Sequence, residues 1–191
     1  MSKLSEVFDD IYRHDRWGNG SGPGSKPISA ITFLKDLTAF TKGKTALDVG
    51  CGDGRLAGCW AEYAASYLGV DVSAESITLF RKSSQHPCVQ MNVADAVWHF
   101  DFALIKDVLQ HLPLEECSRL LRAVRNCGTV WVINDQPDGI RVPDCDPGGY
   151  RPIDPRFLVP EFRVRSQYTI AGFHKVLWEW TPSAGEAPTE R

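Results

Sequence analysis

Apolar and polar residues alternate along the chain in blocks whose spacing fits helices and strands in turn. Residues 4–13 carry apolar side chains at helical spacing, and residues 27–40, which open with a proline, do the same. The strands predicted after them are 44–50, 67–72, 88–93, 101–108 and 129–135, and the helices predicted among these strands are 54–66, 74–84 and 113–125. Strands separated by helix-length segments predict a parallel, doubly wound α/β sheet.

The last third of the chain breaks this alternation. Residues 136–160 are too rich in proline and glycine for a helix, and a loop of this length in a compact domain is typical of a functional or a disordered segment. Residues 162–170 and 173–180 then form a predicted antiparallel pair, joined by a tight turn at Ala171 and Gly172. These two strands bring the predicted Rossmann-like sheet to seven strands, of which the last are antiparallel.

Composition and charge narrow the classes of function. The formal net charge of −3 gives no electrostatic drive toward nucleic acid, whose binding proteins present a basic patch. The sequence contains no run of about 18 apolar residues, so no membrane span is predicted. The acidic start of the chain lacks the apolar core of a signal peptide. The six cysteines form no CxxC pair and no zinc-type spacing. We therefore expect free thiols, no metal site, and a cytoplasmic protein that binds neither nucleic acid nor membrane.

The segment ALDVGCGDG, residues 46–54, carries the clearest chemical signal. A buried strand is predicted to end at Asp48, and glycines at alternate positions from Gly50 make the turn into the next helix. Glycines there let the backbone approach a ligand at the ends of the strands. Asp71 ends the next predicted strand, where an acidic side chain can accept hydrogen bonds from both hydroxyls of a ribose. Together these features predict a cofactor that contains a nucleoside.

The glycine spacing separates two kinds of cofactor. A dinucleotide-binding turn reads GxGxxG, and its third glycine would stand where this chain has Arg55. The pattern Asp-x-Gly-x-Gly-x-Gly instead resembles the first motif of class I S-adenosylmethionine-dependent methyltransferases. The resemblance continues in order over residues 44–135, through LGVDVS (68–73), QMNVAD (90–95) and IKDVLQHLP (105–113). It implies the fold of that family, with S-adenosyl-L-methionine as the cofactor and S-adenosyl-L-homocysteine as the product.

The resemblance also implies which residues hold the cofactor. In that family the glycine turn lies against the methionine end, the later acid holds the ribose, and the QMNVAD segment meets the adenine. Asn92 stands where the family more often has an acid, so the choice between Asn92 and Asp95 for the adenine amino group stays open. The predicted cofactor-binding residues are Asp48, Gly50, Cys51, Gly52, Asp71, Val72, Asn92, Val93, Lys106 and Trp17.

Asp107 and His111 are the candidate catalytic residues. They lie four apart, immediately after the fourth predicted strand, so they can share one face of a helical turn. If a hydroxyl is methylated, its proton must leave, and a general base nearby assists. We predict that His111 is this base and that Asp107 orients it or holds the acceptor. Two alternatives stay open: Asp107 caps the helix, or Asp107 and Asp135 bind a metal ion, for which two oxygens are thin support.

The acceptor is predicted to be a small molecule or the end of a glycan. The KDVLQ segment lacks the Asn/Asp-Pro-Pro-aromatic motif of DNA amino-methyltransferases, which argues against methylation of bases. RWG…SGPGS and a later YRPID resemble segments of short bacterial and viral methyltransferases, some of which are associated with modification of sugars. The resemblance favours O-methylation of a sugar-type hydroxyl. The predicted acceptor-binding residues are Tyr12, Ser25, Asp135, Tyr150 and Arg151.

The glycine-rich stretch RWGNGSGPGSKP, residues 16–27, precedes the helix that leads into the first strand. In this fold it should cross the carboxyl end of the sheet. We predict that it is a lid over the active site, which contacts either the cofactor or the acceptor. The alternative is a flexible linker without a ligand.

We expect a single domain over residues 1–181. Its predicted parts are an N-terminal helical cap with the glycine-rich lid (1–43), a cofactor-binding core (44–135), a substrate loop (136–160) and closing strands (161–181), followed by a disordered tail (182–191). The protein is expected to be a monomer or a homodimer. Three other functions remain: a catalytically silent protein that binds S-adenosylmethionine, an N-methyltransferase of a small amine, and a nicotinamide-linked oxidoreductase, which Arg55 disfavours.

Overall fold

A seven-stranded mixed sheet forms the centre of the molecule. The computed structural model describes residues 3–137 and 143–182, so the predicted tail lies almost wholly outside the described residues. The strands are β1 (Thr45–Val49), β2 (Ser66–Asp71), β3 (Cys88–Gln90), β4 (Phe102–Lys106), β5 (Thr129–Asp135), β6 (Arg163–Ile170) and β7 (Phe173–Trp180). Their order is β3-β2-β1-β4-β5-β7-β6, with β6 and β7 antiparallel to their neighbours. The predicted fold class, including the antiparallel closing pair, is confirmed.

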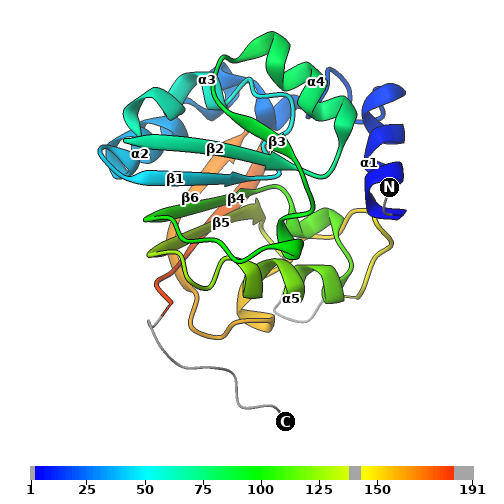
Figure 1. The fold of residues 1–191 in the computed structure, drawn as a ribbon. Helices are drawn as coiled ribbons and strands as arrows, with labels where there is room; N and C mark the ends of the chain where they lie inside the picture. Colours follow the sequence, from blue (N-terminus) through cyan, green and yellow to red (C-terminus); the bar gives the residue numbers. More distant parts are fainter. Residues whose placement is uncertain (1–2, 138–142, 183–191) are drawn as a thin grey trace.

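Helices cover both faces of this sheet. They are α1 (Lys3–Arg13), α2 (Ile31–Thr41), α3 (Ala57–Trp60), α4 (Ala74–Ser83) and α5 (Leu114–Ala123). As drawn in Figure 1, α3 and α4 lie above the sheet, α5 lies below it, and α1 stands at one side. Side chains at successive strand positions point to opposite faces, so a strand that is buried on both faces reads as a continuous apolar run. Accordingly, Ala46 packs with α2 and α3, whereas its neighbour Leu47 packs with α1 and α5.

The connections reverse direction between β1 and β4. From β1 the chain proceeds outward to β2 and β3, and it then returns to pair β4 with the other side of β1. The crossovers on the two sides leave a crevice at the carboxyl ends of these two strands, which is where open α/β sheets bind ligands. The glycine turn follows β1 at this point, Lys106 ends β4, and Asp107 follows it.

Several predicted elements differ from the observed ones. The predicted helix 54–66 is reduced to α3 and a 3₁₀ turn (Ala61–Tyr63), because the backbone N–H of Ala65 already donates to Lys44 at 2.8 Å where the chain enters β2. The predicted helix 27–40 begins as a 3₁₀ turn (Pro27–Ala30) before α2.

The predicted substrate loop is partly a packed segment rather than an open one. Its residues 138–142 lie outside the described residues, but Ile153 and Asp154 are buried and a 3₁₀ turn forms at Pro155–Phe157. The proline content correctly excludes a helix, whereas the apolar contact of Ile153 with the core depends on tertiary packing that composition does not reveal.

Candidate active site

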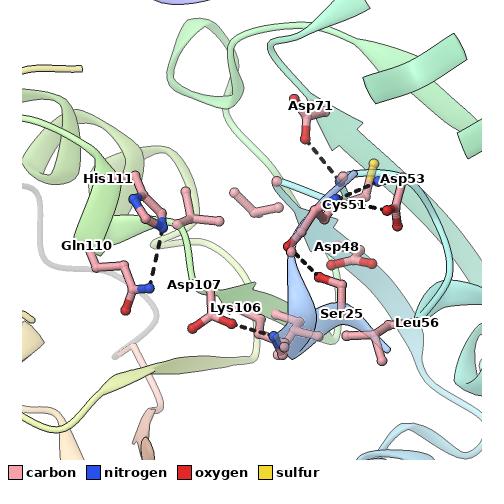
Figure 2. Close-up of a pocket in the computed structure, with 18 of the residues that line it drawn as sticks. Ser25, Asp48, Cys51, Asp53, Leu56, Asp71, Lys106, Asp107, Gln110 and His111 are labelled. Carbon is pink, nitrogen blue, oxygen red and sulfur yellow. Dashed lines mark hydrogen bonds and ion pairs between the residues drawn. The ribbon is translucent and has the colours of Figure 1, made fainter. Parts of the chain in front are cut away.

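A cavity of about 320 Å³ lies at the carboxyl ends of β1, β2, β4 and β5. This volume falls within the range of small-molecule sites. Figure 2 shows Asp71 on one side of the cavity and His111 on the other, with Lys106 and Asp107 between them. The two ends of the cavity therefore present different chemistry, and we call the end around Asp71 the cofactor end and the end around His111 the acceptor end.

The glycine turn forms the floor of the cofactor end. Gly50, Gly52 and Gly54 have φ angles of 67°, 59° and 76°, in the left-handed region that favours glycine. A Cβ on Gly52 would lie 2.3 Å from the Ser21 hydroxyl oxygen, so no other residue fits there without displacing the chain above it. The sequence pattern thus reflects both the backbone conformation and a close approach.

Asp71 lies at the end of β2, where it receives two backbone hydrogen bonds. The N–H groups of Gly52 and Ser73 donate to its two carboxylate oxygens at 3.0 and 2.9 Å, which fixes the carboxylate at the edge of the cavity. Burial raises the pKa of this carboxyl, and the two N–H donors oppose the rise. Each carboxylate oxygen keeps lone pairs for further donors. The geometry suits the predicted binding of ribose hydroxyls.

Asn92, and not Asp95, lines the cavity. The Asn92 side-chain oxygen accepts from Ala94 N–H at 3.0 Å, so its amide NH₂ group remains to donate into the cavity. Asp95 is exposed and pairs with Arg119 at 3.1 Å. The structure therefore favours Asn92 of the two alternatives that the sequence left open, and Val93 lies beside it in the lining.

Asp48 is a buried carboxyl beneath the glycine turn. It accepts from the Tyr67 hydroxyl at 2.8 Å. Burial raises its pKa to about 6, although the Tyr67 bond and the nearby Lys106 act in the opposite direction. The indole N–H of Trp60, also in the lining, has no hydrogen-bond acceptor among the described residues. A buried donor without an acceptor and a buried acid with a raised pKa are unusual in a dry core and are suited to a polar ligand group.

The glycine-rich stretch lies across the cavity and is hydrogen-bonded to the glycine turn. The Ser21 N–H donates to the Asp53 carboxylate and the Ser21 hydroxyl accepts from the Asp53 N–H, both at 2.9 Å. Tyr12 hydroxyl and Ser21 hydroxyl are also 2.9 Å apart, and the Ser25 hydroxyl donates to the Ser21 carbonyl. Trp17, Ser21 and Ser25 all line the cavity.

His111 faces the cavity from the turn after β4, with one ring nitrogen fixed. Its Nδ1 lies 2.8 Å from the carbonyl oxygen of Gly149, a group that only accepts, so Nδ1 carries a proton. In the neutral ring Nε2 is then the basic nitrogen. The Gln110 amide nitrogen lies 3.4 Å from this Nε2. Burial lowers the pKa of His111, while the Gly149 bond and Asp107 oppose this. The Trp17 ring packs on the imidazole, with centroids 4.9 Å apart.

Four charged side chains meet at the acceptor end. Lys106 pairs with Asp107, and Lys175 on β7 lies 2.7 Å from Asp107 and 2.6 Å from Asp135. The hydroxyl of Tyr150 donates to Asp135 at 2.8 Å. Asp107 does not cap a helix: its φ is 57°, a left-handed conformation in which a residue other than glycine is uncommon and which clusters at functional sites.

Arg151 is the predicted acceptor-binding residue that the structure places elsewhere. Its side chain is 4% exposed and does not line the described cavity. The guanidinium donates to the carbonyl oxygens of Leu109 and Leu112 at 2.8 and 2.7 Å, and the Arg151 N–H donates to that of Gln110 at 2.9 Å. Gly148 N–H donates to the His111 carbonyl at 2.9 Å. Segment 148–151 therefore holds the turn that carries His111 and leaves no free guanidinium face for an acceptor.

The other predicted site residues meet around one cavity. They are Tyr12, Trp17, Ser25, Asp48, Gly50, Cys51, Gly52, Asp71, Val72, Asn92, Val93, Lys106, Asp107, His111, Asp135 and Tyr150. Lys175 and Gln110 line it too and were missed by the sequence reasoning. Lys175 interrupts a strand that is otherwise apolar at its buried positions, which is a signal that could have identified it; Gln110 offers none, because it looks like an ordinary residue of a turn.

The described residues hold neither a cluster of metal ligands nor a membrane-spanning helix. Across residues 3–137 and 143–182, no three histidine, cysteine or acidic side chains are placed to share a metal ion. Within the same ranges, no helix has both the length and the apolar character needed to cross a bilayer.

Comparisons with known proteins agree with this geometry. Residues 47–130 match the family model described as "Methyltransferase domain". A ubiquinone biosynthesis O-methyltransferase of Coxiella burnetii is 25% identical over 142 residues, which cover 68% of this chain and 56% of that protein. The chain thus spans about half the length of the curated relatives it matches.

Solved structures show the same fold. Magnesium protoporphyrin IX methyltransferase from Synechocystis PCC 6803, with bound SAM, has a TM-score of 0.69 at 16% identity, covering 96% of this chain and 99% of that one. A Burkholderia thailandensis 1,6-didemethyltoxoflavin-N1-methyltransferase, with S-adenosylhomocysteine, has a TM-score of 0.64 at 21% identity, covering 92% and 85%. The motif, the sheet order and these matches support a class I S-adenosylmethionine-dependent methyltransferase, with S-adenosyl-L-methionine as the cofactor.

Proposed function

We propose that the protein methylates a hydroxyl group of a small molecule, with His111 as the general base. The observation that carries this proposal is the fixed tautomer of His111. Because Nδ1 is held by the Gly149 carbonyl, Nε2 is the basic nitrogen of a ring that lines the same cavity as the cofactor turn, and its one close neighbour, the Gln110 amide nitrogen, is a weak contact at 3.4 Å. A base that is neutral at physiological pH and faces the acceptor end is what an oxygen acceptor requires.

The residues of the cofactor end fit S-adenosylmethionine. Asp71 offers carboxylate lone pairs to ribose hydroxyls, Asn92 offers an amide to adenine, and Asp48 offers a buried carboxylate to a cationic amino group. When bound, the cofactor supplies an electrophilic methyl group on a sulfonium sulfur and leaves as the neutral thioether. The rest of the work, which is alignment and proton removal, belongs to this chain.

Proton removal is assigned to His111. As the acceptor oxygen gains its methyl group, its proton passes to Nε2, and the imidazolium that forms keeps its Nδ1–H bond to Gly149. Asp107 and Asp135 lie near enough to favour the positive ring, because both raise the pKa of His111. Trp17 packs over the imidazole and restricts its exposure to water.

A sugar-type hydroxyl is the acceptor we propose. The acceptor end combines charged groups with two partly exposed aromatic rings, those of Tyr150 and Phe173, which are 56% and 50% exposed. Polar groups that fix orientation beside apolar surface are the general composition of a small-molecule site, and a sugar offers both hydroxyls and an apolar ring face. The Coxiella relative is named as an O-methyltransferase, which also favours oxygen.

The test begins with cofactor binding and ends with an acceptor screen. We expect S-adenosylmethionine and S-adenosylhomocysteine, but not NAD(P), to raise the melting temperature. A panel of nucleotide sugars, monosaccharides, phenols and amines is then incubated with the cofactor, and the products are identified by mass spectrometry. A mass gain of one methyl on a sugar oxygen supports the proposal, whereas methylation of amines alone would favour N-methylation, which the Burkholderia neighbour's name also allows. Binding of both cofactor forms without turnover of any acceptor would favour the silent binding protein.

A further inference from the structure

Lys175 occupies the centre of the acceptor end, although neither the cofactor motif nor the choice of base requires it. It comes from β7, which runs antiparallel to β5 and places Lys175 directly opposite Asp135. The side chain is 4% exposed, and its ammonium lies between two carboxylates, 2.7 Å from Asp107 and 2.6 Å from Asp135. A lysine this deeply buried on a strand costs stability unless its charge is matched.

The charge is matched completely. The second oxygen of Asp107 faces Lys106, and the second oxygen of Asp135 accepts from the Tyr150 hydroxyl. Although burial acts against the charged forms, the ionic partners lower the pKa of Asp107 and raise that of Lys175. The two ammonium groups and the two carboxylates are therefore paired in equal number.

The ammonium keeps one donor for a ligand. An ammonium group has three N–H donors, and Asp107 and Asp135 account for two of them. Lys175 lines the cavity, and its ammonium lies 5.7 Å from the centroid of the Phe173 ring, which also lines it, so the third N–H is available to a ligand beside that ring. A group with a lone pair, such as a hydroxyl, an oxyanion or a carbonyl oxygen, can accept a hydrogen bond from it.

We propose that the Lys175 ammonium is the cation of the acceptor site: held between Asp107 and Asp135, it hydrogen-bonds an acceptor oxygen and takes the place of a divalent metal. The part that concerns the acceptor rests on the proposed function, and the part that concerns the metal does not. As the acceptor hydroxyl gives its proton to His111, the negative charge that develops on oxygen is stabilised by a fixed positive charge in a buried site.

The same geometry decides the metal alternative. A divalent cation between Asp107 and Asp135 would need the two oxygens that Lys175 now binds. Pairing of β7 with β5 and β6 holds the backbone of Lys175 in place, and the buried ammonium would lose both of its ionic partners if the side chain turned away. The carboxylates that the sequence offered as metal ligands are thus ligands of an ammonium group.

The metal part is tested with Mn²⁺, which needs no acceptor. Binding of Mn²⁺ is followed by electron paramagnetic resonance in the presence of S-adenosylhomocysteine, for the unmodified chain, Lys175→Arg and Lys175→Ala. We expect no binding by the first two, which keep the cation, and binding by Lys175→Ala, which frees both carboxylates. Lys35→Ala, which removes an exposed lysine on α2, is the control and should behave as the unmodified chain. Binding of Mn²⁺ by the unmodified chain overturns the proposal, even if Lys175→Ala does not fold.

The acceptor part is tested with a hydroxyl compound that the screen shows to be methylated. Lys175→Met should lower kcat/KM by about 100- to 1,000-fold, the loss typical of one donor to a developing oxyanion. The Kd for S-adenosylhomocysteine should stay unchanged, and Lys175→Arg should restore part of the activity. Unchanged kcat/KM in folded Lys175→Met refutes this hydrogen bond. If the screen finds only amine acceptors, the proposed function fails, while the Mn²⁺ result still decides the metal part.

Discussion

At the scale of single residues, burial determines the charge of the groups that line the cavity. His111 and Asp48 are both desolvated, and in each case burial favours the neutral form: the pKa of the imidazole falls and that of the carboxyl rises. A neutral imidazole can accept a proton, and a carboxyl whose pKa is about 6 is ionised above that pH and can then bind a cationic group. Both effects lead to measurable pH dependence.

The pH profile reports the base. Because the pKa of His111 lies below its usual value of 6.5, we expect kcat/KM for a hydroxyl acceptor to stay high down to about pH 6.5 and to fall below it as Nε2 is protonated. His111→Ala should lower kcat by about 100- to 10,000-fold, the range for one general base, and should abolish this acidic limb. Its Kd for S-adenosylhomocysteine should be unchanged. Full activity in His111→Ala would remove His111 from the mechanism and leave the cofactor site intact.

Asp48 is expected to lower the free energy of unfolding and to strengthen the binding of S-adenosylmethionine. Its pKa rises from 3.8 unfolded to about 6 folded, so the folded state binds more protons between these values and loses stability as the pH rises through them. Above pH 6 the ionised Asp48 lowers the free energy of unfolding by its full amount. Asp48→Asn, which still accepts from Tyr67, should therefore raise the free energy of unfolding by ~1–3 kcal/mol at pH 8 and gain little at pH 4. Urea unfolding at the two pH values measures this.

The control for Asp48 is an exposed acid with the opposite shift. The pKa of Asp101 is lowered by hydrogen bonds from Thr45, so Asp101→Asn should give no gain at pH 8. We also expect Asp48→Asn to bind S-adenosylmethionine more weakly than the unmodified chain. Equal stability of both variants at pH 8 would show that Asp48 is not held at a cost.

At the scale of elements, two irregular segments build the site on a regular sheet. Segment 148–151 binds four consecutive carbonyl oxygens of the turn 109–112 and fixes the imidazole of His111. The glycine-rich stretch 16–27 is bound to the glycine turn through Ser21 and Asp53. Each segment carries its own prediction.

Arg151 is expected to be a structural residue of the site. Arg151→Met leaves buried carbonyl oxygens without their charged donor, which should lower the free energy of unfolding by ~2–4 kcal/mol. Arg163 offers a matched control, because it also donates to two carbonyl oxygens but is exposed, so Arg163→Met should cost less than ~1 kcal/mol. Hydrogen exchange should accelerate at residues 148–151 in the Arg151 variant alone. Similar losses in both variants would contradict the buried role.

Gly52 links the two segments of the cofactor end. In Gly52→Ala the new methyl group meets the Ser21 hydroxyl at 2.3 Å and the backbone must keep φ at 59°. In Gly18→Ala, φ is 72° but nothing lies within 4 Å. In both variants an alanine at positive φ should lower the free energy of unfolding by about 1 kcal/mol. Only Gly52→Ala should also displace the stretch 16–27. We expect at least about tenfold weaker binding of S-adenosylhomocysteine for Gly52→Ala by calorimetry, a loss of ~1.4 kcal/mol, and little change for Gly18→Ala.

At the scale of the whole molecule, the cofactor end joins parts of the chain that are far apart in sequence. One cavity is lined by residues of four segments: the 16–27 stretch, the turn after β1, the end of β2 and the turn after β3. A ligand that binds the folded state alone stabilises all of them together. The size of that effect follows from its concentration and affinity.

S-adenosylhomocysteine at 100 times its Kd should stabilise the fold by about 2.7 kcal/mol. For a domain of this size that corresponds to a rise in melting temperature of ~5–10 °C. NAD at the same concentration should give no shift, since Arg55 replaces the third glycine of a dinucleotide turn. A shift with NAD and none with S-adenosylhomocysteine would contradict the assigned cofactor.

The sequence by itself determined the alternation of strands and helices and the class of the cofactor. Apolar runs separated by helix-length segments are a local pattern. Gly50 and Gly52 are required by a left-handed backbone conformation, and Asp71 stands at the end of a strand, so these features can also be read along the chain. The length of α3 was predicted wrongly. The residues after it favour a helix, but the backbone N–H of Ala65 donates to Lys44 where the chain enters β2, and this ends the helix.

Only the tertiary structure decided the acceptor end. Arg151 and Lys175 look interchangeable in the sequence as basic residues of the last third, yet one is turned toward backbone carbonyls and the other toward the cavity. That difference arises from the antiparallel register of β7 against β5, which sets Lys175 opposite Asp135. Register and loop packing depend on contacts between distant residues, and no local spacing encodes them.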